Sequence, residues 1–354
     1  MNSLKRLNCY NLKNLSIILL DLTELEKIDS QKMFQTYDEW SKIAREAYDF
    51  DHNQIEFKNI DHIVFVGMGG SGAIGDIFAS ILSKTKIHVS VVKGYILPNT
   101  VDSNTLVIST SVSGDTVETL TVLKSTLDLE CKTISFSSGG KMEEFCKNNK
   151  LEFRKIPFFH SPRASFVSFL FSMLKVLKNI IQLKDEDVKE CLTYLDNMTK
   201  KISSNNLTEK NPALKLAEWL TGIPLIYYPH GLESSAIRFK NSLQENAKMH
   251  VFEEDVIEAC HNGIVSWEKK SNVQPILLQG VDDYIKTKER WKILKKFFNE
   301  EKINFWEIIS VEGSILSKLV CMIYLLDYTS IYKAAISKID PSPVKSITYF
   351  KDRL

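Results

Sequence analysis

The chain has 354 residues, of which 44% are hydrophobic and 25% charged, and its formal net charge is +1. This composition is typical of a soluble globular protein long enough for two domains, and the near-neutral charge argues against a nucleic-acid-binding surface. The six cysteines lie far apart without a C-x-x-C pair, which favours reduced thiols in a cytoplasmic protein over disulfides or a zinc site. No apolar run approaches the roughly 20 residues that span a membrane, and the stretch from Ile17 to Leu20 is too short for a signal-peptide core.

Strand and helix patterns alternate along the first half of the chain. Residues 1–58 are charged and mostly helical in pattern, and we expect them to pack on the outside of a first domain at 59–160. Within that domain the apolar runs predict strands at 63–66, 87–92, 105–109, 132–136 and 151–156. Strands that alternate with helices in this way favour a parallel sheet covered on both faces.

A second alternation follows a bridging region at 161–206. This region contains an apolar helix from Ala164 to Leu183 and a linker candidate at 203–206. In a second domain at 207–354 we predict helices at 234–249 and 283–299, and strands at 223–228, 250–252, 274–279 and 303–309. Two helices end the chain, and we expect the last to begin at Asp340–Pro341, where Asp can cap the helix and Pro suits its first position.

A glycine-rich loop, Gly67 to Gly72, joins the first predicted strand to a helix. Glycines allow a sharp turn and a close approach to a ligand, and the following helix offers free N–H groups to an anion. The loop also satisfies the dinucleotide fingerprint G-x-G-x-x-G, but the second strand leads into Val92–Lys93–Gly94 without the expected acidic residue. An NADP site is therefore disfavoured but left open, as is a turn without a ligand.

A second loop, Ser109 to Thr119, has the same strand-to-helix setting. Seven of its eleven residues carry a hydroxyl group or are glycine, and none is basic. One helix cap needs one hydroxyl, so Ser111, Ser113 and Thr116 together exceed what capping explains. The two loops predict a phosphate-binding site.

Both loops resemble those of the sugar isomerase (SIS) domain, a flavodoxin-like sheet that binds phosphosugars. Further stretches, in order along the chain, resemble the bifunctional phosphoglucose/phosphomannose isomerase family. They are Ser161 to Ala164, Ala236 to Lys240, Gln244 to Lys248, His261 with Asn262, Asp327 to Tyr332, Asp340 to Val344, and Phe350 with Lys351. The resemblance implies an α/β fold of two flavodoxin-like SIS domains, each a parallel sheet covered by helices.

The resemblance also implies roles for individual residues. Glu245 would be the base that moves a proton between C1 and C2, although periodicity alone places it on a polar helix face with Arg238. His261 would open the sugar ring from the partner subunit of a homodimer. Arg163 would stabilise the enediolate, and Lys351 would assist ring opening. The phosphate would be held by Gly70, Ser71, Ser111, Ser113 and Thr116.

The implied substrate is glucose 6-phosphate or mannose 6-phosphate, converted to fructose 6-phosphate. No metal or other cofactor is expected, since the histidines do not cluster at ligand spacing. Three positions depart from the family pattern: Gln244 replaces an asparagine, Gly263 replaces the glutamate of H-N-E, and Val112 replaces a tyrosine. An isomerase for a different phosphosugar and a non-catalytic phosphosugar-binding protein are therefore the alternatives.

Overall fold

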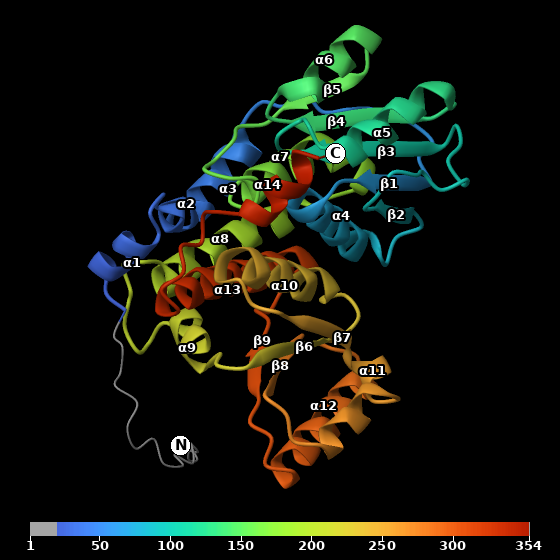
Figure 1. Cartoon of the computed structure of the whole chain (residues 1–354). Coiled ribbons are helices and arrows are strands. Elements are labelled where there is room, and N and C mark those ends of the chain that lie inside the picture. Colours follow the sequence, from blue (N-terminus) through green and yellow to red (C-terminus); the bar gives the residue numbers. More distant parts are fainter. Residues whose placement is uncertain (1–19, 354) are drawn as a thin grey trace.

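Two sheets lie at opposite ends of the molecule, with a layer of helices between them (Figure 1). The computed structural model describes residues 20–353. Residues 1–19 and 354 lie outside this description, and with them Cys9 and all but the last residue of the Ile17 to Leu20 stretch.

The helices and strands of the described residues follow the predicted alternation. The strands are β1 (His62–Val66), β2 (His88–Val92), β3 (Thr105–Ser111), β4 (Lys132–Ser137), β5 (Glu152–Lys155), β6 (Ile223–Tyr228), β7 (Phe252–Asp255), β8 (Val273–Gln279) and β9 (Trp306–Ile309). The helices are α1 (Leu22–Ile28), α2 (Met33–Asp38), α3 (Trp40–Asp49), α4 (Gly69–Leu82), α5 (Val117–Ser125), α6 (Gly140–Asn149), α7 (Phe166–Ile181), α8 (Asp185–Ile202), α9 (Pro212–Trp219), α10 (Glu233–Ala247), α11 (Val256–Ala259), α12 (Ile285–Glu300), α13 (Ile315–Ile336) and α14 (Lys345–Lys351). Short 3₁₀ segments lie at Thr126–Asp128 and Gly263–Glu268.

The first sheet is parallel throughout and has the strand order β2-β1-β3-β4-β5. Every residue of β1 and β3 is buried, as expected for central strands covered by helices on both faces. The order is that of flavodoxin, so the predicted fold class is confirmed. Because β1 is flanked by β2 on one side and β3 on the other, the direction of chain winding reverses between β1 and β3. Ligands of such sheets bind outside the carboxyl ends of the strands at this point.

The second sheet repeats the pattern with one strand fewer. Its order is β7-β6-β8-β9, again parallel, so that β6 takes the place that β1 has in the first sheet. Helix α10 follows β6 as α4 follows β1, and α10 packs against α4. This contact brings the first helix of each domain together in the central layer.

Helix α13 is the centre of the helical layer and packs against α8, α9 and α10. Contrary to the expectation from the sequence, it is long and apolar enough to cross a membrane by length and composition. Its most apolar 18-residue window is nevertheless 83% buried within the protein. The apolar character of α13 therefore serves the core that joins the two domains.

Two predicted features differ in the structure. The last helix begins at Lys345, not at Asp340, because the Asp340 carboxylate accepts hydrogen bonds from Ser342 N (3.0 Å) and Ser30 Oγ (2.5 Å) and so closes a turn. The linker candidate at 203–206 is not a free connection. Ser204 is buried and donates from its N–H and its hydroxyl to the carboxylate of Asp38 (2.9 and 2.6 Å).

Replacing Asn211 should weaken the junction between α8 and α9. The buried Asn211 side chain caps α9 by accepting from Ala213 N (2.9 Å) and Leu214 N (3.1 Å), and it donates to the carbonyls of Ile202 and Asn206. We expect Asn211→Ala to lower the free energy of unfolding by about 1–2 kcal/mol in urea titrations. Asn299→Ala, at an exposed position in the last turn of α12, is the control and should change it by less than about 0.5 kcal/mol. Equal effects of the two substitutions would contradict this account of the cap.

Candidate functional site

The two predicted phosphate loops lie side by side at the carboxyl ends of β1 and β3. Val66, the last residue of β1, is paired with Ser109 in β3, so the loops leave the sheet at neighbouring points. Gly67 makes this approach possible, because a Cβ atom there would lie only 3.0 Å from the carbonyl oxygen of Thr110. The structure thus brings the two loops together at the point where the winding direction reverses.

Hydroxyl groups gather where the second loop enters α5. The Ser111 hydroxyl lies 2.8 Å from that of Thr116 and accepts from Gly114 N (3.1 Å), while Ser113 is exposed and accepts from Asp115 N (3.3 Å). Thr116 is the N-cap residue of α5, but its side chain does not cap the helix. The side chain of Met68, the N-cap residue of α4, does not cap that helix either, and Gly70 and Ser71 lie in its first turn. Within residues 20–353, both helices therefore begin with backbone N–H groups that no capping side chain occupies.

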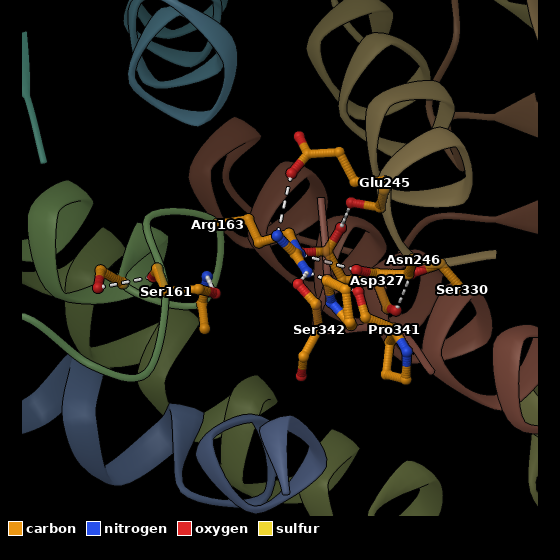
Figure 2. Close-up of polar contacts among 12 residues, drawn as sticks. Ser161, Arg163, Glu245, Asn246, Asp327, Ser330, Pro341 and Ser342 are labelled. Atoms are coloured by element: carbon orange, nitrogen blue, oxygen red, sulfur yellow. Dashed lines mark hydrogen bonds and ion pairs between the residues drawn. The ribbon is translucent and has the colours of Figure 1, made fainter. Parts of the chain in front are cut away.

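Arg163 and Glu245 form an ion pair beside these loops (Figure 2). Arg163 Nη1 lies 3.2 Å from Glu245 Oε2, and the side chains are 6% and 26% exposed. The remaining guanidinium donors are held by protein: Nε donates to Asn246 Oδ1 (2.8 Å), and Nη2 donates to the carbonyls of Pro341 (2.7 Å) and Ser342 (3.1 Å). Arg163 is therefore fixed on three sides and presents Nη1 to the Glu245 carboxylate.

A buried ion pair between Arg238 and Asp327 lies behind Arg163. Arg238 is 2% exposed and donates from Nε and Nη2 to Asp327, which is fully buried and also accepts from Ser242 Oγ (2.6 Å). Burial opposes the charge on Arg238, but the neighbouring Asp327 carboxylate, with Tyr37 and Glu245, raises its pKa above the ordinary value. Arg238 Nη2 also donates to the carbonyl of Arg163 (2.7 Å).

Gly70 connects the glycine-rich loop to both arginines. A Cβ atom at Gly70 would lie 3.2 Å from Arg238 Nη1 and 3.8 Å from Arg163 Cα. The loop of the first domain is therefore packed directly on the residues that hold Glu245 of the second domain. This contact places the glycine-rich loop next to the Arg163–Glu245 pair, with the second loop beside it at the edge of the sheet.

The structure does not bring the other two predicted catalytic residues to this pair. His261 is exposed after α11, and Lys351 is exposed at the end of α14. Within residues 20–353, neither makes a polar contact with Arg163 or Glu245. Lys248 is closer to them: its ammonium donates to the carbonyls of Glu245 and of Pro343 (2.8 Å), and burial, then Arg163, lowers its pKa.

Sequence reasoning missed the supporting roles of Arg238 and Asp327. Periodicity placed Arg238 on the same solvated face as Glu245, and the structure shows that this was wrong, because α10 is covered by α13 on one side and by α4 on another. A signal was present: α13 is apolar over most of its length yet contains Asp327 in its interior. A buried charge needs a partner of opposite sign, which Arg238 provides.

His160 lies close to the segments that hold Arg163. Both of its ring nitrogens are buried and have no hydrogen-bond partner within the described residues, and its backbone is left-handed (φ +52°). Burial lowers the pKa of His160, the Asp29 carboxylate opposes this effect, and Arg163 lowers the pKa further. Asp340 is a second carboxylate close enough to favour a charged imidazole.

Comparisons with known proteins identify the domains of the chain. Residues 56–173 match the model of the SIS domain, and residues 209–354 match that of the bacterial phospho-glucose isomerase C-terminal SIS domain. The fold is similar to that of the C-terminal domain of glucosamine-fructose-6-phosphate aminotransferase from Francisella tularensis, with a TM-score of 0.64 at 17% identity over 89% of this chain and 96% of that one. The chain is thus an SIS-domain protein.

Two curated relatives narrow this class. The chain is 32% identical to the bifunctional phosphoglucose/phosphomannose isomerase of Caldicellulosiruptor bescii, over 91% of this chain and 98% of the relative. It is 29% identical to the protein of the same name from Aquifex aeolicus, over 86% and 95% of the two chains. The chain belongs to the bifunctional phosphoglucose/phosphomannose isomerase family, and it is an isomerase.

Removing the negative charge of Asp327 should destabilise the whole protein. Asp327→Asn leaves Arg238 buried without an anionic partner, and breaking such a pair costs about 3–5 kcal/mol. We expect a correspondingly lower free energy of unfolding in urea titrations. Asp352→Asn, at an exposed position after α14, is the control and should have almost no effect. A variant Asp327→Asn that is as stable as the original protein would refute the structural role given to this pair.

The unusual site of His160 predicts a pH-dependent stability. Because its folded-state pKa is lowered, the unfolded chain binds more protons as the pH falls below about 6.5, and stability decreases with the pH. We expect His160→Asn to reduce the fall in Tm between pH 7.5 and pH 5.5. Asn is chosen because it tolerates the left-handed backbone at this position. His250→Asn, at an exposed histidine, is the control. If His160→Asn left the fall unchanged, His160 would not be one of the groups that cause it.

Proposed function

We propose that this protein interconverts hexose 6-phosphates by aldose–ketose isomerisation. The proposed substrates are glucose 6-phosphate and mannose 6-phosphate, and the common product is fructose 6-phosphate. The family supports the reaction class. The observation that carries the proposal for this chain is the Arg163–Glu245 pair, packed through Gly70 against two loops suited to an anion.

Glu245 has the geometry of a general base. Only its Oε2 atom pairs with Arg163, and within residues 20–353 no donor is bound to Oε1. The free oxygen would take the proton from C2 of the open-chain aldose and return it to C1, while the hydroxyl proton of O2 passes to O1, so that no proton is gained or lost overall. A positioned carboxylate base of this kind typically contributes a factor of about 10²–10⁴ to the rate.

Arg163 would stabilise the enediolate formed between these two proton transfers. Its Nε and Nη2 donors are already occupied by Asn246 and by the carbonyls of Pro341 and Ser342. The guanidinium therefore needs little reorganisation when negative charge develops on the substrate oxygens near Nη1, and such preorganised donors stabilise a transition state most.

The remaining parts of the site would hold the phosphate and open the ring. We propose that the phosphate binds at the uncapped helix starts through Gly70, Ser71, Ser111, Ser113 and Thr116. We propose that His261 acts on the sugar ring in the site of a partner subunit, since in its own chain it is exposed and makes no polar contact with Glu245 among the described residues. A homodimer follows from this assignment, and Lys351 would assist ring opening.

No cofactor is assigned to the reaction. Among residues 20–353, no group of three or more His, Cys, Asp and Glu side chains is placed to hold a metal ion. We therefore expect turnover to persist after treatment with a chelator. The expected location of the enzyme is the cytoplasm.

Glu245→Gln is the decisive variant. It keeps the size of the side chain but removes the base, so we expect kcat for fructose 6-phosphate formation to fall by about a factor of 10³. Binding of 5-phosphoarabinonate, an analogue of the enediolate, should weaken far less in calorimetry. Glu233→Gln, at an exposed position at the start of the same helix, is the control and should retain full activity.

Two outcomes would count against the proposal. No fructose 6-phosphate from either hexose phosphate with the unaltered protein would refute the isomerase assignment. Binding of the analogue without turnover would instead support a non-catalytic phosphosugar-binding protein.

A further inference from the structure

The space beside Gly263 is filled by the carboxylate of Glu254. A Cβ atom at Gly263 would lie 2.5 Å from Glu254 Oε2 and 2.7 Å from Oε1, so a side chain at this position would fit only if the Glu254 carboxylate moved aside. The backbone at Gly263 does not require glycine, because it is not among the left-handed glycines of the described residues. The Glu254 carboxylate therefore occupies the space into which a side chain at position 263 would extend, and this is the position at which the family pattern has a glutamate.

Glu254 reaches this place from the second sheet. It lies near the carboxyl end of β7, paired with Tyr227 in β6, and the next residue, Asp255, caps α11 by accepting from Ile257 N (2.8 Å) and Glu258 N (3.2 Å). Helix α11 leads directly into the turn that carries His261. The turn is fixed in its own right, because the side chain of the residue after His261, Asn262, donates to Glu258 Oε1 (2.9 Å).

The Glu254 carboxylate is half-buried. Within residues 20–353 no group donates a hydrogen bond to it. Burial raises the pKa of Glu254, and Glu258 and Asp255 raise it further. The other titratable groups around it are Tyr227 and Tyr228 of β6, Cys260, and Arg290 of α12, which faces Cys260.

A carboxylate in this state has free acceptor oxygens. Carboxylates whose pKa is perturbed cluster at functional sites. Sugars offer hydroxyl donors, and a carboxylate that carries no other hydrogen bond accepts them well. The Glu254 carboxylate lies beside the His261 turn, which the proposed function places in the active site. A sugar bound in that site would therefore contact Glu254.

We infer that Glu254 is a substrate-binding residue of this enzyme. From a different point of the chain, it supplies beside the His261 turn the carboxylate that Gly263 lacks. Glu254 accepts hydrogen bonds from hydroxyl groups of the open-chain sugar when the His261 turn enters the active site of a partner subunit. This assignment rests on the proposed function, because it takes His261 to act on the same sugar.

The test compares Glu254→Gln with Glu268→Gln, the matched control at an exposed position at the end of the 3₁₀ segment Gly263–Glu268. We expect Glu254→Gln to lower kcat/KM for glucose 6-phosphate and mannose 6-phosphate about tenfold, mainly through KM, while its Tm stays unchanged because the half-buried carboxylate accepts no hydrogen bond within residues 20–353. The control should remain within twofold of the unaltered enzyme. A residue with a merely structural role would lower Tm and kcat/KM together.

Moving the carboxylate supplies the second arm of the test. Glu254→Ala removes it and clears the space at 263, and the double variant Glu254→Ala, Gly263→Glu returns it there. We expect the double variant to recover at least half of the kcat/KM that Glu254→Ala loses. A Glu254→Gln enzyme within twofold of the unaltered one, or a double variant as poor as Glu254→Ala, would overturn the assignment.

A binding measurement distinguishes failure of the Glu254 assignment from failure of the isomerase proposal. If the unaltered protein binds 5-phosphoarabinonate but produces no fructose 6-phosphate, the isomerase proposal fails. The Glu254 assignment then depends on whether Glu254→Gln weakens that binding about tenfold in calorimetry: weaker binding supports it, and unchanged binding overturns it.

Discussion

The ion pair between Arg238 and Asp327 is the interaction on which the rest of the site depends. Neither charge has access to water, so each is tolerable only while the other stays in place. This requirement ties α10 to α13 in one register. The same guanidinium holds the backbone carbonyl of Arg163 and lies against Gly70. One buried charge pair thus sets the relative positions of the glycine-rich loop, the arginine beside it and the helix that carries Glu245.

This arrangement explains why the site is built from both domains. Each sheet alone offers the start of a helix after its first strand: α4 after β1, and α10 after β6. The contact between α4 and α10 places the glycine-rich loop of the first domain against Arg238 of α10, the helix that carries Glu245 near its other end. Packing in the central helical layer thus sets the distance between this loop and Glu245.

Local pattern was enough to predict the strands, the two loops and a parallel sheet covered by helices, whereas the flavodoxin-like class was implied by the resemblance to SIS domains. These features depend on neighbours in sequence: apolar runs bounded by glycine, and clustered hydroxyls at a helix start. The role of Arg238 could not be predicted in this way, because helical periodicity describes only one buried face and α10 has neighbours on more than one side. The true start of α14 was missed for a similar reason. Asp340 and Pro341 have the residue types of a helix start, but Ser30, 310 positions away in the chain, contacts Asp340 instead.

The contact between Arg163 and the carbonyls of Pro341 and Ser342 has a consequence for the synthesis of the protein on the ribosome. They hold the guanidinium of Arg163, although Pro341 is synthesised 178 residues later than that arginine. The first sheet and its glycine-rich loop are synthesised long before these carbonyls. In a nascent chain the guanidinium of Arg163 therefore lacks these acceptors until nearly the whole polypeptide has been made.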